Sequence, residues 1–214
     1  MQAELSLFLR QHYFPALPHN AKEAVGKLVQ FLVSRGVKMI ASDFDLTITT
    51  QHTGGFASKN SERYRSLLRS VSRDFCELGQ MFEGAGLKIS IVSFADRNSC
   101  RDRDEERGGS DLIIDILKAS QAPFQVESII DRYPANYQDP EDYSPLGLKE
   151  PMRMSKSYHL KSLCQEYGLQ KHQILLLDDS LENCNVAVQE GYPSLGVLGG
   201  EGFRFEILTD DFRR

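Results

Sequence analysis

The chain of 214 residues contains no tryptophan, only four cysteines and no excess of positive charge. Cys76, Cys100, Cys164 and Cys184 form no CxxC pair, which argues against a structural zinc site, a dithiol redox site or a disulfide framework. We expect these cysteines to be reduced and mostly buried. The net charge is −5, from 25 basic and 30 acidic residues, so the cationic excess that drives non-specific binding to nucleic acid or anionic membranes is lacking.

Long hydrophobic runs are lacking as well. No segment approaches about eighteen uninterrupted apolar residues, and the N-terminal segment has no basic stretch followed by a long apolar run. We therefore expect a soluble, cytoplasmic protein whose partners include neither a membrane nor nucleic acid. Hydrophobic residues make up 41% and charged residues 26%, which are globular values and argue against a disordered or fibrous chain.

Helical and strand patterns alternate along the chain. Apolar residues at helical spacing predict helices over residues 20–35, 58–82, 111–120 and 156–168, the third capped by Ser110 and the fourth opened by Ser155. Short apolar runs predict strands over residues 37–44, 87–93, 126–130 and 174–178. This alternation predicts an α/β fold, a Rossmann-like parallel sheet flanked by helices with right-handed crossovers.

The length favours a single domain over residues 1–214. Residues 1–35 form an N-terminal helical extension in this interpretation. Residues 132–154 carry four prolines and show neither helical nor strand period, so we expect a long surface loop inserted before the last helix and strand pair.

Polar residues that could carry chemistry follow three of the predicted strands. One strand runs into Asp43 and Asp45, the next ends in Ser93, and the last ends in Asp178 and Asp179. In open parallel α/β sheets, ligands bind at the carboxyl ends of the strands. Carboxylates that converge from buried strands repel one another and are costly to bury unless a cation lies between them. A small set of hard oxygen ligands favours Mg²⁺ over zinc, which would favour His and Cys.

These residues also form motifs that resemble those of the haloacid dehalogenase superfamily of phosphatases and phosphotransferases. The first motif, DxDxT, matches Asp43, Asp45 and Thr47. The second, an apolar strand that ends in Ser or Thr, matches Ser93. The third, a lysine at a helix start, matches Lys156.

The fourth motif of the resemblance is an apolar strand running into DDxxxN, and it matches LLLDDSLEN with Asp178, Asp179 and Asn183. The resemblance covers residues 37–198. Lys149, seven residues before Lys156, is an alternative match to the third motif. Asp178 and Asp179 also have a simpler interpretation as caps of the following helix.

The resemblance implies phosphoryl transfer through an aspartyl-phosphate. Asp43 would be the nucleophile, and Asp45 would protonate the leaving oxygen and then activate the attacking water. Lys156 would be catalytic as a positive charge beside Asp43 and the phosphoryl group. The phosphate itself would be bound by Ser93, Thr47 and Lys156.

The resemblance further implies a Mg²⁺ cofactor. Its ligands would be Asp43, the main-chain carbonyl of Asp45, Asp179 and, in addition, Asp178. The dehalogenase branch of the superfamily lacks the second acid of the first motif, so the presence of Asp45 favours phosphate chemistry.

Other polar residues are interpreted as structural. His52, His159 and His172 are expected on loops or helix surfaces. The run from Arg97 to Arg107 contains four Arg, two Asp and two Glu, so its net charge is zero and a solvated face is expected.

Members of the superfamily usually select small substrates with an inserted cap domain, and this chain has little room for one. Residues 48–88 hold a turn and one long predicted helix, and the second insertion slot offers only residues 132–154. We therefore expect no large cap domain and an open site, with Tyr133, Tyr137 and Tyr143 as residues that could line the approach. An open site suits a phosphate on a bulky carrier, whose own surface can exclude water.

The function that follows is a Mg²⁺-dependent phosphomonoesterase acting on a phosphorylated protein or peptide. Phosphotyrosine is favoured because an aryl oxide leaves easily without precise contacts. One alternative is a small-metabolite or sugar phosphatase in which residues 132–154 form a lid. Another is a binding module that keeps the fold and has lost turnover.

Overall fold

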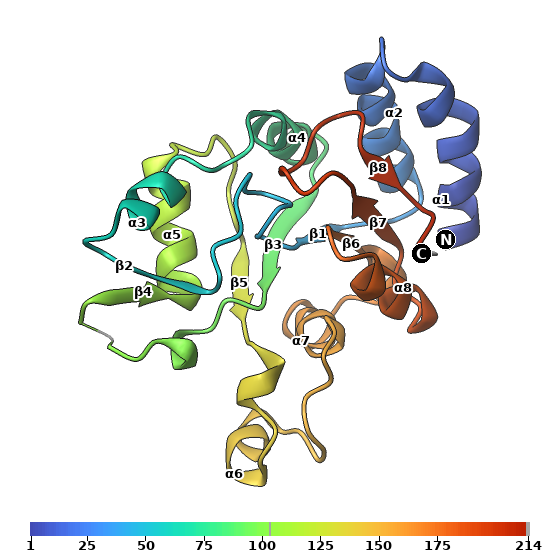
Figure 1. Ribbon diagram of the computed structural model, residues 1–214. Coiled ribbons are helices and arrows are strands. Elements are labelled where there is room, and N and C mark those ends of the chain that lie inside the picture. The colour runs from blue at the N-terminus through green and yellow to red at the C-terminus, as the bar shows by residue number, and fades with distance from the viewer. Residues whose placement is uncertain (103, 213–214) are drawn as a thin grey trace.

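The computed structural model describes residues 1–102 and 104–212 and has an α/β architecture (Figure 1). The strands of its main sheet are β1 (Met39–Ser42), β3 (Lys88–Ser93), β5 (Ser128–Asp131), β6 (Ile174–Asp178), β7 (Ser194–Val197) and β8 (Leu208–Thr209). Within the described residues the six strands lie in the order β5-β3-β1-β6-β7-β8. All neighbours are parallel except β7 and β8, which are antiparallel. The predicted parallel sheet flanked by helices is confirmed.

Helices connect these strands. The α-helices are α1 (Gln2–Phe8), α2 (Ala21–Ser34), α3 (Glu62–Leu67), α4 (Arg73–Gly84), α5 (Gly109–Ala119), α6 (Pro140–Tyr143), α7 (Ser157–Tyr167) and α8 (Leu181–Gln189). A π-helix continues α1 over Leu9–Tyr13, and short 3₁₀ turns cover Phe14–Ala16, Arg97–Ser99, Pro134–Asn136, Ser144–Leu146 and Lys171–Gln173. No helix among the described residues has the length and apolar character needed to span a bilayer.

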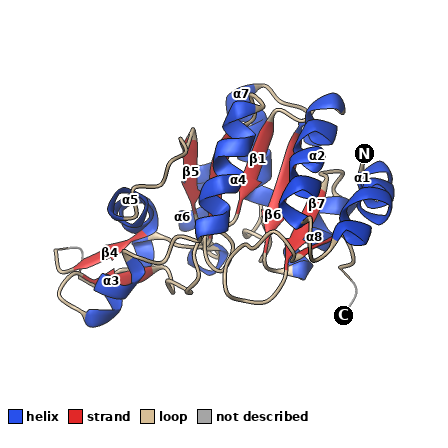
Figure 2. Cartoon of the chain, turned by 90° about the horizontal axis from the view of Figure 1, so that it is seen from above, coloured by secondary structure: helices blue, strands red, loops and turns tan. Residues whose placement is uncertain are grey.

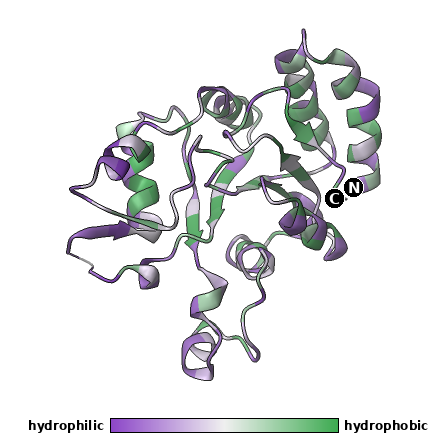
Figure 3. Cartoon of the chain, viewed as in Figure 1, coloured by the Kyte–Doolittle hydropathy of each residue, from purple (hydrophilic) through white to green (hydrophobic). Residues whose placement is uncertain are grey.

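The helices cover both faces of the sheet because successive strand side chains point to opposite sides. Ile40 and Leu175 belong to the larger apolar core, which the sheet forms with α2, α4 and α5. Met39, Ala41 and Leu176 belong to a smaller core formed with α7 and α8. Figure 1 shows α2 and α4 on one side of the central strands and α7 and α8 on the other. In Figure 3 the central strands carry hydrophobic colour.

Strand register brings the predicted site residues to one edge of the sheet. Ser42, the last residue of β1, pairs with Ile91 of β3 and with Leu177 of β6. The Asp43 N–H then donates to the Leu177 carbonyl at 2.8 Å. The residue after β1 therefore lies beside the end of β6 and the carboxyl end of β3.

The helix predicted over residues 58–82 is wrong as a single element. The structure divides this segment into the end of β2 (Phe56–Ser58), α3 and α4. The side chains of Ser61 and Ser72 accept hydrogen bonds from the N–H groups of Tyr64 and Phe75, so each serine starts a new helix. The amphipathic period continued through both helices and concealed the break between them.

A second small sheet was not predicted. β2 pairs antiparallel with β4 (Glu106–Gly108), so segments that follow β1 and β3 are joined outside the main sheet. Figure 2 shows this pair beside α3 and set apart from the main sheet, and Figure 3 shows hydrophilic colour on β4. Strands of three residues are too short to show an alternating hydrophobic pattern, so their pairing depends on tertiary contacts.

Other predicted boundaries shift by a few residues. α5 begins at Gly109 with Gly108 as its N-cap, and the predicted cap Ser110 instead donates its N–H to the Asp131 carboxylate at 2.6 Å. The strand predicted over 126–130 is β5, two residues later at its start. The predicted loop over 132–154 contains α6 and two 3₁₀ turns.

The 132–154 segment is held by buried contacts of its own. Tyr137 and Met152 are buried, and the Gln138 side chain donates to the carbonyls of Pro134 (2.7 Å) and Met152 (3.0 Å). These bonds join the two ends of the segment. Apart from Pro134, Tyr137 and Met152, the segment is exposed or partly exposed, so it lies at the surface and its buried residues hold it in place.

None of the four cysteines, all in the described part of the chain, forms a disulfide bond. Only Cys184 is buried, whereas Cys76, Cys100 and Cys164 are partly exposed, so the expectation that most are buried is wrong.

Candidate active site

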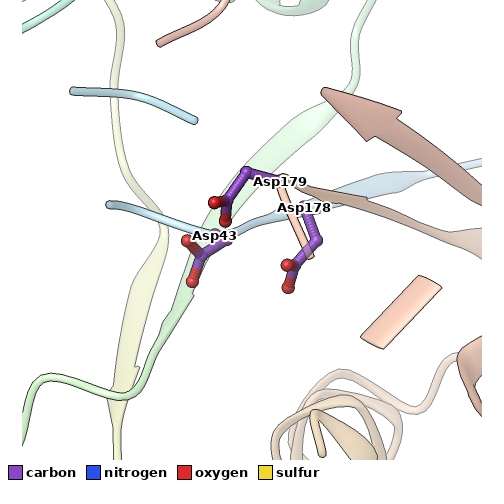
Figure 4. Close-up of side chains that lie close together, drawn as sticks. All are labelled: Asp43, Asp178 and Asp179. Carbon is purple, nitrogen blue, oxygen red and sulfur yellow. The ribbon is translucent and has the colours of Figure 1, made fainter. Parts of the chain in front are cut away.

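Three carboxylates meet where β1 and β6 end. Asp43, Asp178 and Asp179 each offer an oxygen within 4.8 Å of the others (Figure 4). Asp178 is fully buried and Asp43 is 6% exposed. Adjacent parallel strands place their terminal residues side by side, so two short segments far apart in the sequence form one acidic cluster. The predicted metal residues Asp43, Asp178 and Asp179 therefore lie together.

Lys156 provides the positive charge of this cluster. Its Nζ donates to Asp43 Oδ1 at 2.6 Å and to the Val92 carbonyl at 2.7 Å, and it lies 4.0 Å from Asp178 Oδ2. The same ammonium group lies 4.0 Å from the centroid of the Phe94 ring. The Lys156 side chain is buried. Lys149 is exposed, so the alternative match to the third motif is excluded.

The environment of Asp178 and Asp179 disfavours two free carboxylates. Asp178 Oδ1 accepts the Ser180 N–H at 2.8 Å, and the Asn183 amide lies 3.2 Å from both of its oxygens. Burial, and then the charge of Asp43, raise the pKa of Asp178 to about 7 and that of Asp179 to about 6. One lysine against three carboxylates leaves excess negative charge. This all-oxygen donor set fits a hard divalent cation such as Mg²⁺.

We expect Asp179→Asn to stabilise the metal-free protein, and to do so more at pH 8 than at pH 5. The pKa of Asp179 is raised from its ordinary 3.8 to about 6, so its stabilising contribution is full below about pH 4 and is lost as the pH rises through about 6. Thermal unfolding in EDTA should show the variant above wild type at pH 8 by on the order of 3 °C, with a smaller gap at pH 5.

Glu182→Gln is the matched control, because Glu182 is an exposed acid of the same cleft. It should change the melting temperature by less than about 1 °C at either pH. Added Mg²⁺ should raise the melting temperature of wild type more than that of Asp179→Asn. A difference in melting temperature between wild type and Asp179→Asn that does not depend on pH would contradict this explanation.

Asp45 lies in the same cleft and is held by a residue that the sequence did not point to. The Thr53 N–H donates to Asp45 Oδ1 and the Thr53 hydroxyl to Asp45 Oδ2, each at 3.0 Å. The exposed His52 places Nδ1 3.2 Å from Oδ2. Burial, and then the charge of Asp43, raise the pKa of Asp45. Nothing in the segment TTQHTGG marks Thr53 in advance, because the contact depends on how the chain folds back over the end of β1.

The loop that carries Thr53 is anchored from outside the main sheet. Arg63 of α3 donates to the Thr53 carbonyl at 2.6 Å. The Gly55 carbonyl accepts the N–H of Gly109 at 3.1 Å. α3 and the first residue of α5 thus support the loop that holds Asp45.

Two predicted phosphate-binding residues have different outcomes. Ser93 lines the cleft, and its hydroxyl oxygen accepts the Ala95 N–H at 3.0 Å, which leaves the hydroxyl hydrogen available to a ligand. Thr47 is fully buried and is not among the residues that line the cleft. Leu46, with φ of 55°, turns the chain away after Asp45, and the Thr47 carbonyl accepts from the Phe203 N–H at 2.9 Å. The structure therefore does not bring the Thr47 side chain into the cleft with the other motif residues.

The cleft above these residues has a volume of about 680 Å³. It is lined by the aspartates, Ser93 and Lys156, by further polar residues that include His52, Ser99 and Glu182, and by a group of apolar side chains. The apolar lining residues are Phe56, Phe94, Ala95, Tyr133 and Met154. Tyr133 and Met154 are 36% and 56% exposed, so they are open to a bound molecule.

The other tyrosines expected near the approach are placed differently. Tyr137 is buried, and neither Tyr137 nor Tyr143 lines the cleft. Arg97 and Arg107 each pair with Asp111, at 3.2 and 3.9 Å, and lie on a partly exposed surface. Position 103 of that run lies outside the described residues.

The three histidines considered in the sequence differ in their exposure. His52 and His172 are exposed, as predicted. His159 is fully buried, so its predicted place on a helix surface is wrong.

The chain matches no protein-family model and no curated protein sequence. Among solved structures it is similar to D,D-heptose 1.7-bisphosphate phosphatase from B. bronchiseptica complexed with magnesium and phosphate, with 13% identity and a TM-score of 0.47, over 75% of this chain and 80% of that one. It is also similar to a dehalogenase with intermediate complex, with 12% identity and a TM-score of 0.42, over 92% and 72% of the two chains. A phosphonoacetaldehyde hydrolase-like protein from Oleispira antarctica matches at 14% identity and a TM-score of 0.42, over 65% and 42%.

The motifs found in the sequence come together in the structure. One cleft is lined by residues from all four motifs, namely Asp43 and Asp45 after β1, Ser93 at the end of β3, Lys156 before α7, and Asp178 with Asp179 after β6. The α/β fold and the meeting of these four motifs agree with the resemblance to the haloacid dehalogenase superfamily of phosphatases.

Proposed function

We propose that the protein is a Mg²⁺-dependent phosphomonoesterase that acts through an aspartyl-phosphate on Asp43. One observation carries this proposal. The Asp43 carboxylate is paired with the buried Lys156, two further carboxylates lie within 4.8 Å, and a second acid, Asp45, lines the same cleft. A nucleophile, a charge partner, a metal-binding set and an acid for proton transfer are the parts that such a reaction needs.

Four residues of the site have separate roles in the proposed reaction. Lys156 holds Asp43 in place through Oδ1 and offsets negative charge as the phosphate ester approaches. Ser93 donates its hydroxyl to a phosphoryl oxygen. Asp45, whose pKa is raised by burial and by Asp43, is suited to keep a proton for the leaving oxygen and then to accept one from water. Thr53 keeps the Asp45 carboxylate in one orientation through both oxygens.

The metal-binding set fits the same reaction. Asp43, Asp178 and Asp179, with the main-chain carbonyl of Asp45, would hold Mg²⁺. A bound Mg²⁺ supplies charge neutralisation that lets an anionic nucleophile meet an anionic phosphate.

The apolar side chains of the cleft support an aromatic leaving group. Phe56, Phe94, Tyr133 and Met154 line the cleft beside the polar side chains of His52, Ser99 and Glu182, and Lys156 is the only Lys or Arg among the described lining residues. A sugar phosphate needs hydrogen-bonding partners for its hydroxyls, whereas an aryl ring buries well against aromatic side chains. We therefore favour phosphotyrosine in a protein or peptide, reached through an open site without a large cap domain.

Substrate comparison tests this proposal. With Mg²⁺ present, phosphotyrosine peptides should be hydrolysed with kcat/KM at least equal to that of small sugar phosphates. The double variant Tyr133→Ala, Met154→Ala should raise KM for a phosphotyrosine peptide about 30-fold, since each truncated side chain removes roughly 1 kcal/mol of apolar contact. Its kcat should stay near that of wild type because the catalytic acids lie on the strand ends.

Tyr143→Ala is the matched control, since Tyr143 belongs to the same segment but does not line the cleft. It should leave KM unchanged. A strong preference for one sugar phosphate, with kcat lost in the double variant, would instead support a metabolite phosphatase in which residues 132–154 act as a lid. Absence of turnover on any phosphate ester, with Mg²⁺ still bound, would support a binding module.

A further inference from the structure

His159 is a fully buried histidine that has no part in the mechanism described above. It lies on α7, one turn after Lys156, and its ring centroid is 5.6 Å from that of Phe94. Phe94 is also the ring against which the Lys156 ammonium packs. His159 therefore lies directly behind the phosphate-binding floor of the cleft.

The hydrogen bonds of His159 join two strand ends. Its Nε2 lies 3.2 Å from the Ser93 carbonyl oxygen and 3.1 Å from the Arg132 carbonyl oxygen. Carbonyl oxygens only accept hydrogen bonds, so Nε2 must carry the hydrogen and donate to both. Ser93 ends β3 and Arg132 directly follows β5, so one imidazole links the carboxyl ends of two parallel strands by hydrogen bonds.

The ring is a fixed, neutral donor. Burial, and then the neighbouring charge of Lys156, lower the pKa of His159 to about 3. Arg132 is the other cation whose charge acts in the same direction. The second ring nitrogen, Nδ1, is buried without a hydrogen-bond partner among the described residues. A neutral ring in one tautomer holds its partners at any pH near neutrality.

Lys156 and His159 together hold two consecutive carbonyl groups. Lys156 Nζ donates to the Val92 carbonyl at 2.7 Å, and His159 donates to the next one, that of Ser93. The first turn of α7 is therefore attached at two adjacent points to the end of β3. This attachment sets where the Ser93 hydroxyl and the Lys156 ammonium lie relative to each other.

We propose that His159 is a positioning residue for phosphate binding, which fixes Ser93 and Lys156 in the geometry that receives the phosphoryl group. The proposal rests on the function proposed for the cleft. His159 acts through the backbone of Ser93 and through the helix turn it shares with Lys156, without touching substrate. Small errors in such positioning have large kinetic effects, because the donors must match the phosphoryl oxygens closely.

The test compares His159→Leu, which removes the donor, with His159→Gln, whose amide can restore an N–H near the Nε2 position. With p-nitrophenyl phosphate and Mg²⁺, His159→Leu should lower kcat/KM by about 30-fold or more, and His159→Gln should remain within about 5-fold of wild type. The dissociation constant of orthovanadate, a phosphate mimic, should rise by at least about 10-fold in His159→Leu. The affinity for Mn²⁺ alone should not change, because the metal-binding acids follow β1 and β6.

Leu163→Ala is the matched control. Leu163 is fully buried on the same helix and faces the smaller core, so its truncation destabilises α7 without touching the strand ends. It should lower the melting temperature as much as His159→Leu does, while keeping vanadate affinity and kcat/KM near wild type. All measurements are made at least about 15 °C below the lowest melting temperature.

The outcomes separate the two proposals. If His159→Leu loses stability like Leu163→Ala but keeps kcat/KM and vanadate affinity within 3-fold of wild type, the positioning role is wrong. If wild type hydrolyses no phosphate ester, the proposed function is wrong, and vanadate affinity alone then decides about His159. Should His159→Leu fail to fold, His159→Asn takes its place, since its shorter side chain cannot reach both carbonyls. Wild-type vanadate affinity in His159→Asn would then overturn the proposal.

Discussion

Asp43→Asn should reduce the hydrolysis of p-nitrophenyl phosphate by at least about 10³-fold. The change removes the attacking carboxylate oxygen and one member of the metal-binding set, while altering the side-chain volume very little. The amide oxygen can still accept the hydrogen bond that Lys156 now donates to Asp43 at 2.6 Å. We therefore expect a folded but inactive protein, checked by steady-state kinetics and by thermal unfolding.

A phosphoryl mimic gives a second readout for Asp43. Beryllium fluoride with Mg²⁺ should raise the melting temperature of wild type and should leave that of Asp43→Asn unchanged. Asp139→Asn, a change of the same kind at an exposed site, should keep both the activity and the shift. Activity of Asp43→Asn within 10-fold of wild type, or a beryllium fluoride shift that needs no Mg²⁺, would refute the nucleophile assignment.

Asp45→Asn should lower kcat on p-nitrophenyl phosphate by about 10²–10⁴-fold through loss of general acid–base catalysis. An aryl oxide leaves without much help from an acid, so the first step should still phosphorylate Asp43. The second step needs a base for water and should fail. The phosphorylated enzyme should therefore accumulate, and mass spectrometry of the peptide containing Asp43 should detect it in Asp45→Asn and not in wild type.

Thr53→Val tests the hydrogen bonds that hold Asp45. Valine has nearly the same shape as threonine and lacks the hydroxyl that donates to Asp45 Oδ2 and accepts the Gly55 N–H at 3.1 Å, while the main-chain N–H to Oδ1 remains. We expect a loss of about 10-fold in kcat, smaller than that of Asp45→Asn and with the same accumulation of phosphorylated enzyme.

An Asp45→Asn protein that stays unphosphorylated while Asp43 is intact would contradict the assigned order of steps.

Local patterns in the chain were enough to predict the core of the sheet. Hydrophobic runs end in Ser93 and Asp178 in the sequence and in the structure, because a buried strand needs continuous apolar residues and the first polar residue marks the carboxyl edge. The fixed spacing of Asp43 and Asp45 likewise predicted acids at one strand end. Parallel α/β topology brings such ends together, so an acidic cluster could be expected without coordinates.

Contacts between segments that are distant along the chain could not be predicted from local patterns. Lys156 rather than Lys149 reaches Asp43, because only the residue at the start of α7 faces the end of β1. Thr53 reaches Asp45 because α3 and the first residue of α5 hold its loop, and His159 is buried because α7 packs on the ends of β3 and β5.

Thr47 shows the opposite outcome, since the turn at Leu46 takes a motif residue away from the cleft. The strand ends and the kinds of group they carry could be predicted from short segments, because hydrophobic period and motif spacing are local properties. Packing between segments determined which polar side chains are buried, paired or turned away, because those free energies depend on neighbours that are remote along the chain.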